Sequence, residues 1–320
     1  MKIVVLFFIL ISNIIFSQNI ENIDSVEAYE FDFFNEFPNV RDISISNNQA
    51  EMYFTIEGFK KEFSFIAVSK KINGVWQRPK VAPFSGKDKD LEPFLSPDNL
   101  KLFFASNRAI ESNNPKEDMD IWYVERESLN TQWSKPIHIE APINTDKDEF
   151  YPAITNSGNL YFTSAYEEDS KGKEDIYISK LVDGKYIKPM SLGDAINSET
   201  YEFNAYVSPD ERIIIFSSYR RSDTVGGTDL YISFKDQQDN WKPAINLGEG
   251  INSDKIDYCP FIDFKSNTVY FTSERSEQNQ NYETHQNIQE ILNEMKSHPN
   301  GLSRIFKVNL TEILSKNKMN

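Results

Sequence analysis

Short apolar runs separated by turn residues fill most of the chain, and they predict β-strands. The runs are about four to eight residues long and rich in Ile, Val, Phe and Tyr. Between them stand turns such as Ser208-Pro209-Asp210, where proline sets φ at the second position and the serine hydroxyl can bond to the local backbone. This pattern predicts an all-β chain built from antiparallel hairpins.

A pair of apolar runs recurs along the chain behind an acidic residue. The clear copies begin at Asp90, Glu149, Glu202 and Asp257, and a weaker first copy begins at Asn35. The copies follow one another in steps of 55, 59, 53 and 55 residues when aligned on Pro38, Pro93, Pro152, Ala205 and Pro260. Such regular spacing indicates a repeat architecture.

Two more segments complete the repeat. The third is an Asp followed by two apolar or aromatic residues, as in Asp120-Ile121-Trp122, Asp175-Ile176-Tyr177 and Asp229-Leu230-Tyr231. The fourth is an aromatic residue shortly before a Lys/Arg-Pro pair; these aromatic residues are Trp76, Trp133, Tyr186 and Trp241. Four antiparallel strands per repeat predict the blade of a β-propeller.

The repeated residues resemble the WD40-like β-propeller repeat of the TolB type. The second copy carries Ser96-Pro97-Asp98, Ser106-Asn107-Arg108 and Asp120-Ile121-Trp122. The fourth carries Ser208-Pro209-Asp210, Ser218-Tyr219-Arg220 and Asp229-Leu230-Tyr231. The resemblance covers roughly residues 36–310 and implies a propeller. It implies no catalytic residue, because these repeats occur in many exported bacterial proteins of unassigned role.

The blade count depends on how the ring closes. The fifth copy has no fourth strand, whereas residues 26–34 supply a spare alternating strand before the first copy. That strand can complete the last blade and leave no open edge, which favours five blades, with six as the alternative. The repeats then fall near 36–91, 92–148, 149–201, 202–256 and 257–310, followed by a tail at 311–320.

An insertion near residues 276–303 interrupts the fifth repeat. Ile288, Ile291, Leu292 and Met295 share one helical face there. We expect a short helix that lies over the propeller. It would join three other variable loops, near residues 109–118, 166–174 and 221–228, on one side of the ring.

The N-terminus predicts export. Residues 1–17 have one lysine, an apolar stretch and a small residue at the end, as in a signal peptide, and residues 18–35 would link it to the ring. We therefore expect a periplasmic or secreted protein with no membrane insertion after signal removal. A formal net charge of −15 argues against nucleic acid as a partner. The single cysteine, Cys259, stands in an apolar run and is expected to be buried.

The acids that open four repeats are the candidate ligand-binding residues. Asp90, Glu149, Glu202 and Asp257 would gather near the axis under the variable loops. There they could bind a cation, a basic peptide or a sugar. The structural alternative is that each acid accepts hydrogen bonds from the neighbouring blade or pairs with the repeated Lys or Arg, since a residue repeated in nearly every copy is normally architectural.

These observations together predict a non-enzymatic, monomeric propeller that binds an envelope protein or glycan through its loop-rich acidic face. The alternative is a glycoside hydrolase or a carbohydrate-binding propeller that uses axial carboxylates, since glycosidases need two carboxyl groups about 5–10 Å apart. No cofactor is expected, apart from a cation at the axial acids. The three histidines show no metal-ligand spacing.

Overall fold

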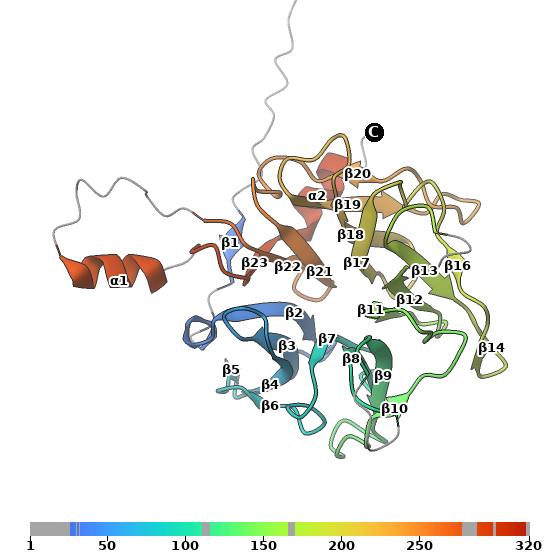
Figure 1. The fold of residues 1–320 in the computed structure, drawn as a ribbon, viewed down its shortest axis with the longest axis horizontal. Helices are drawn as coiled ribbons and strands as arrows, with labels where there is room; N and C mark the ends of the chain where they lie inside the picture. Colours follow the sequence, from blue (N-terminus) through green and yellow to red (C-terminus); the bar gives the residue numbers. More distant parts are fainter. Residues whose placement is uncertain are drawn as a thin grey trace, which may run out of the picture.

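Five antiparallel sheets surround one axis in the computed structural model (Figure 1), which describes residues 26–29, 31, 33–110, 116–165, 170–276, 287–296 and 299–317. The first strands of the sheets line the centre, and each contacts the first strands of its neighbours. The expected five-bladed propeller is confirmed, and the six-bladed alternative is wrong.

The blades follow the order of the chain. Blade 1 contains β2 (Asn39–Ile45), β3 (Glu51–Glu57), β4 (Ser64–Ile72), β5 (Val75–Trp76) and β6 (Lys80–Val81). Blade 2 contains β7 (Asp90–Leu95), β8 (Lys101–Ser106), β9 (Asp120–Glu125) and β10 (Ile137–His138). Blade 3 contains β11 (Glu149–Ile154), β12 (Leu160–Ser164), β13 (Asp175–Ser179) and β16 (Met190–Ser191), with a hairpin of β14 (Leu181–Val182) and β15 (Lys185–Tyr186). Blade 4 contains β17 (Tyr201–Val207), β18 (Ile213–Tyr219), β19 (Thr228–Phe234) and β20 (Ile245–Asn246). Blade 5 contains β21 (Asp257–Asp263), β22 (Thr268–Ser273) and β23 (Arg304–Asn309).

The N-terminal segment closes the ring, as expected. Strand β1 (Glu27–Ala28) pairs antiparallel with β23 and so becomes the fourth strand of blade 5. It is shorter than the nine residues suggested by the alternating pattern, because the chain turns inward after Tyr29 and a 3₁₀ helix follows at Phe34–Glu36. Phe31 and Phe34 are buried in the core, and the Phe34 ring lies 5.0 Å from that of Phe54 in blade 1. The segment therefore joins the first blade to the last.

The first repeat is shifted relative to the sequence alignment. Each first strand contains a β-bulge with one residue at positive φ, and this residue is Asp42 in β2 and Glu92 in β7. The structural equivalent of Pro93 is thus Ile43, and the alignment on Pro38 is wrong by five residues. The hydrogen bond from Ser46 to Asn48 in blade 1 repeats the one from Ser96 to Asp98 in blade 2.

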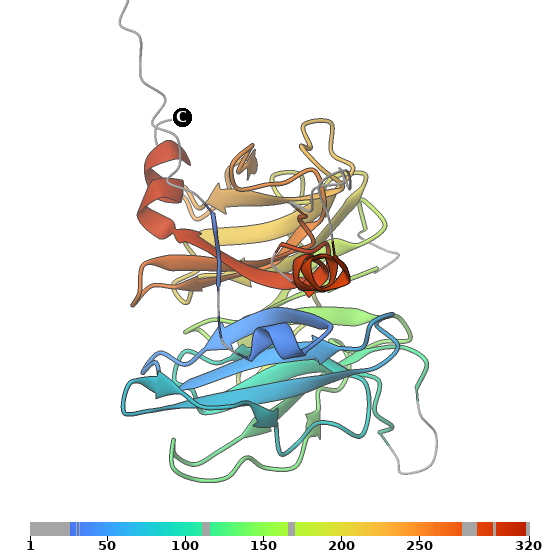
Figure 2. The same cartoon turned by 90° about the vertical axis from the view of Figure 1, so that its left-hand side faces the viewer.

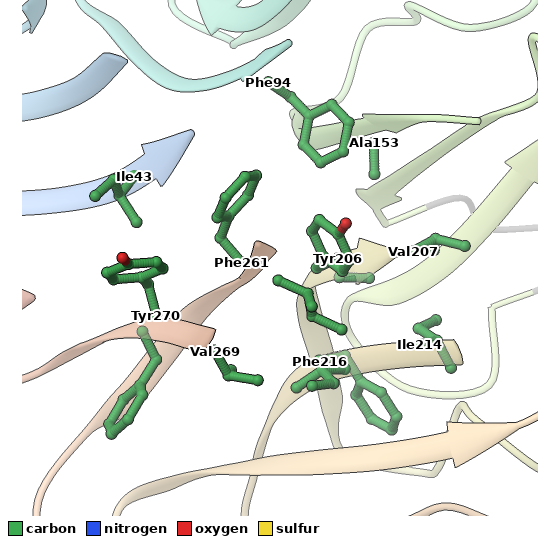
Figure 3. Packing of buried hydrophobic residues seen from close by; sticks show 14 of the residues in the cluster. Ile43, Phe94, Ala153, Tyr206, Val207, Ile214, Phe216, Phe261, Val269 and Tyr270 are labelled. Atoms are coloured by element: carbon green, nitrogen blue, oxygen red, sulfur yellow. The ribbon is translucent and has the colours of Figure 1, made fainter. Parts of the chain in front are cut away.

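Aromatic side chains fill the axis where the first strands end. Phe94, Tyr206 and Phe261 come from three different blades and converge there (Figure 3). The Tyr206 ring lies 5.9 Å from that of Phe94 and 5.4 Å from that of Phe261. This aromatic plug occupies one end of the axis. A ligand that binds at the axis must therefore approach from the other end, where the first strands begin; we call that side the mouth face.

The expected insertion and the expected tail each contain a helix. Helix α1 (Ile288–Lys296) forms inside the insertion, but it stands to the side of the ring and not over it (Figure 1). Its apolar residues Ile288, Leu292 and Met295 are exposed. Helix α2 (Leu310–Asn317) continues directly from β23 (Figure 2) and buries Leu310 and Ile313, so the expected tail is largely helical. Among the described residues, no helix is long and apolar enough to cross a membrane. The predicted signal peptide lies outside them.

Candidate functional site

The four predicted acids stand at or near the starts of first strands, and none of their side chains is exposed. Each carboxylate accepts a hydrogen bond from a hydroxyl group in the segment just before its own strand, as Asp90 does from Ser85 at 2.7 Å. Ser106 donates to Asp90 at 2.6 Å, and Ser218 donates to Glu202 at 2.8 Å. Such hydrogen bonds are consistent with an architectural role for the four acids. A role of these acids in ligand binding stays a prediction.

Three of the four acids also pair with an arginine from the loop after the second strand. Arg108 reaches Asp90 at 2.5 Å, and Arg275 reaches Asp257 at 2.8 Å. In blade 4 the partner of Glu202 is Arg221, at 2.9 Å, and not the Arg220 of the sequence motif. Arg220 instead has positive φ and lies over the Tyr219 ring. An extra residue in this loop shifts the motif by one position.

Glu149 is the exception, because blade 3 has no arginine at the corresponding place. Its carboxylate accepts hydrogen bonds from the Thr145 backbone and hydroxyl, at 3.1 and 2.7 Å, and from Ser164 at 3.2 Å. Burial raises the pKa of Glu149 to about 7, and these hydrogen bonds only partly oppose the shift. Among the described residues of blade 3, no cationic side chain pairs with this buried carboxyl group.

Glu149→Gln should change how stability depends on pH. The folded pKa of about 7 exceeds the ordinary unfolded value of about 4.3, so the contribution of Glu149 is fully present below about pH 4.3 and is lost as pH rises through 7. We expect wild-type protein to lose on the order of 2 kcal/mol relative to Glu149→Gln between pH 5 and 8 in urea unfolding. Glu202→Gln, the matched control, should destabilise at both pH values because it leaves Arg221 unpaired. Parallel pH curves for wild type and Glu149→Gln would contradict this explanation.

The side chains on the axis come from the bulges and not from the four acids. One residue with positive φ occupies the bulge of every first strand, and the five together form the lower tier: Asp42, Glu92, Tyr151, Asn204 and Cys259. Positive φ is uncommon for residues other than glycine, asparagine, aspartate and histidine, so Glu92, Tyr151 and Cys259 are unusual at these positions. All five differ, and all are buried. The five blades therefore differ from one another in the side chains that they place at the axis.

The residues just before the bulges form an upper tier: Arg41, Leu91, Phe150, Phe203 and Tyr258. These five residues, with Glu92 and Asn204 from the lower tier, line a cavity of about 350 Å³ that opens on the mouth face. Its remaining wall comes from neighbouring loops and strand ends, and includes Lys61, Glu174, Ile256 and Glu274. We call this cavity the mouth. It combines apolar and aromatic walls with a charged floor, as ligand sites commonly do.

Arg41 is the central charge of the floor. Its guanidinium donates to Asp42 at 2.7 Å and to Glu92 at 2.9 Å, and it lies 5.1 Å from the centre of the Tyr258 ring. A third carboxylate, that of Glu57, is 3.8 Å away. Asp42 Oδ2 and Glu57 Oε2 are buried without a hydrogen-bond partner. One arginine thus faces three acids, and their hydrogen-bonding capacity is incompletely used.

Glu92 supplies a hydrogen-bond acceptor that a threonine supplies in other blades. In three blades a threonine of the second strand accepts the N–H of the next bulge residue, as Thr55 does for Glu92 at 3.0 Å. Blade 2 has Ala105 at that position, and Glu92 Oε2 accepts the N–H of Tyr151 instead, at 2.8 Å. Burial raises the pKa of Glu92 to about 8, although Arg41 opposes the shift. Asn204 of blade 4 also donates to Glu92, at 3.3 Å. The carboxyl group therefore links four blades below the mouth.

The sequence marks this site by residues that vary between the copies, and not by residues that the copies share. In the four clear copies, the bulge residue is the second residue after the opening acid and stands directly before Pro93, Pro152, Ala205 or Pro260. It varies in every copy while its neighbours repeat. Among the described residues, no group of histidine, cysteine and acidic side chains is arranged to hold a metal ion.

Solved structures with a similar fold include several sugar-cleaving enzymes. The catalytic domain of a GH62 α-L-arabinofuranosidase from Coprinopsis cinerea is 10% identical with a TM-score of 0.52, over 90% of this chain and 95% of that one. A GH43 endo-arabinanase from Bacillus licheniformis is 12% identical with a TM-score of 0.50, over 85% and 94%. A TolB from Agrobacterium tumefaciens is 14% identical with a TM-score of 0.48, over 74% and 71%. Comparisons with protein-family models and with curated sequences give no match. At these identities the likeness shows the propeller fold and not an activity.

Proposed function

We propose that the protein is an exported, non-enzymatic propeller that binds a protein or another ligand of the cell envelope through the mouth. The observation that carries the proposal is the concentration of residues that break the repeat in the two tiers around the axis. Repeat proteins place binding residues where the repeats differ, since the shared positions are needed for stacking. The signal-peptide pattern of residues 1–17 supports export.

The geometry favours binding over sugar hydrolysis. A glycosidase needs two carboxyl groups that both reach the substrate in separate roles. Asp42 and Glu92 are the carboxylates of the lower tier, but both bind the same guanidinium and are only 1% and 5% exposed. Glu174 and Glu274 also line the mouth, and Glu274 is paired with Lys61 at 2.7 Å. Glu149 and Glu202 are fully buried outside the mouth lining. Release of a chromogenic sugar that Glu92→Gln abolishes would overturn this ranking.

A pull-down from envelope extract tests the proposal with three baits. The wild-type bait is compared with Phe203→Asp, which places a charge in the half-buried wall of the mouth, and with Phe264→Asp, which lies beside the aromatic plug and is 47% exposed. We expect Phe203→Asp to lose ligands that wild type and Phe264→Asp retain. Identical sets from Phe203→Asp and wild type would remove the mouth from the proposal.

A fourth bait tests the insertion. Replacing residues 277–300 by a short glycine-serine linker removes α1, which stands beside the ring. We expect this bait to capture the same ligands as wild type. Loss of every ligand from this bait, with Phe203→Asp unaffected, would move the binding site from the mouth to the insertion.

A further inference from the structure

Lys61 shows what kind of group the rim of the mouth accepts. Its ammonium comes from the turn between β3 and β4 in blade 1 and reaches blade 5. There it lies 2.7 Å from Glu274 Oε1 and 5.9 Å from the centre of the Tyr258 ring. A carboxylate beside an aromatic face is a favourable environment for an ammonium group. The rim thus contains an ammonium site that the chain's own lysine occupies.

The acceptors of this site are hydrogen-bonded to a buried serine, whereas the lysine side chain is partly exposed. Ser303 donates to Glu274 at 3.0 Å and shares a hydrogen bond of 2.9 Å with the hydroxyl of Tyr258. Both Ser303 and Tyr258 are buried. The Lys61 side chain is 43% exposed, and an ion pair of that kind contributes only about 0–1 kcal/mol. A ligand ammonium could therefore displace Lys61 at little cost.

The charge balance of the mouth also favours a cation. Four carboxylates lie in or beneath it, against the two cationic side chains of Arg41 and Lys61: Asp42, Glu57, Glu174 and Glu274. Glu92 is not counted, because its raised pKa of about 8 leaves it mostly protonated at neutral pH. Asp42 and Glu57 each keep one buried oxygen without a partner. Buried carboxylates are costly unless they are paired, so an added positive charge would stabilise this region. The hydrogen bonds of Arg41 to Asp42 and Glu92 leave its guanidinium poorly placed to attract an anion.

The walls suit an aliphatic stem. Leu91, Phe150, Phe203 and Ile256 supply apolar side chains to the lining of the mouth. Lysine places four methylene groups behind its ammonium, and these can pack along apolar surface while the charge meets an acceptor. An amino sugar has no such stem, since hydroxyl groups surround its ammonium.

We propose that the mouth receives a lysine side chain of a peptide ligand, whose ammonium replaces that of Lys61 on Glu274 and Tyr258. This inference rests on the proposed function and names the ligand class. The lysine stem lies against Phe150 and Phe203, and the carboxylate of Glu174 faces the same cavity.

Titration calorimetry with a capped Gly-Lys-Gly peptide tests the proposal. Removing the internal competitor by Lys61→Met should tighten binding by up to about fivefold, and Glu274→Gln should weaken it by a similar factor. Lys101→Met is the matched control, because Lys101 is 44% exposed and pairs with Glu125 at 2.9 Å away from the mouth. It should leave the affinity unchanged. The peptide with Nε-acetyl-lysine should not bind.

Three outcomes would overturn the proposal. They are weaker binding by Lys61→Met, equal binding of the acetylated peptide, and binding of glucosamine without binding of the lysine peptide. A further outcome separates this inference from the proposed function. If neither the wild type nor any variant binds the peptide, but Phe203→Asp still loses envelope ligands that the wild type captures, the lysine assignment fails and the mouth remains the site.

Discussion

Phe34→Ala is expected to lower the free energy of unfolding by about 3–5 kcal/mol, the usual cost of removing a buried phenylalanine side chain. Phe34 is 1% exposed, and its ring packs against Phe54 of blade 1 and Tyr29 beside β1. The substitution leaves a cavity at the seam between the first and last blades, so it weakens ring closure itself. Urea unfolding monitored by tryptophan fluorescence measures the change.

The control for this prediction is Phe59→Ala. Phe59 is 76% exposed, and its replacement should change stability by less than about 0.5 kcal/mol. A protein that begins at residue 36 should lose at least as much stability as Phe34→Ala, because it lacks β1, Phe31 and Phe34. Wild-type stability in both altered proteins would show that the N-terminal segment does not close the ring.

Arg41→Met should have a comparable effect for an electrostatic reason. Methionine keeps much of the apolar stem but leaves the carboxylates of Asp42, Glu57 and Glu92 without their shared cation. Removing one partner from a buried charge cluster costs about 3–5 kcal/mol. The loss should be smaller at pH 5 than at pH 8, because burial already raises the pKa of Glu57 and Glu92 and their protonated forms need no counter-charge.

Arg78→Met is the matched control for Arg41. Arg78 is 63% exposed and pairs with Glu36 at the surface, so its loss should leave stability almost unchanged. Urea unfolding of both variants at pH 5 and pH 8 separates the two cases. If Arg41→Met destabilised equally at both pH values, the carboxylates around Arg41 would not be the cause.

The sequence predicts the blades well because their strands depend on local pattern. Alternating or continuous apolar runs and the Ser-Pro-Asp turns determine strands and hairpins over short distances, and the regular spacing supplies the ring. The pairing of β1 with β23 was also predictable, since residues 26–34 alternate like a strand. The short length of β1 was not predictable, because Phe31 and Phe34 are buried by contacts between distant parts of the chain that a local pattern does not show.

The candidate site was harder to predict than the fold. A bulge breaks the two-residue alternation of a strand, so pattern alone does not show that Glu92, and not Asp90, lies on the axis. The bulge of the first repeat was harder still to predict, because Ile43 stands where three of the four later copies have proline. The contact of Arg41 with Glu92 joins two blades, and the approach of Lys61 to Glu274 joins the first blade to the last. Such contacts follow from closure of the ring.

The most direct test of the account is photo-crosslinking from two positions. Benzoylphenylalanine replaces phenylalanine at Phe203, in the mouth, or at Phe264, beside the aromatic plug on the opposite side of the ring. The two proteins are irradiated in envelope extract, and crosslinked products are separated by mass. We expect a discrete crosslinked ligand from position 203 and none from position 264. A product from position 264 alone would contradict the conclusion that this propeller binds its ligand through the mouth.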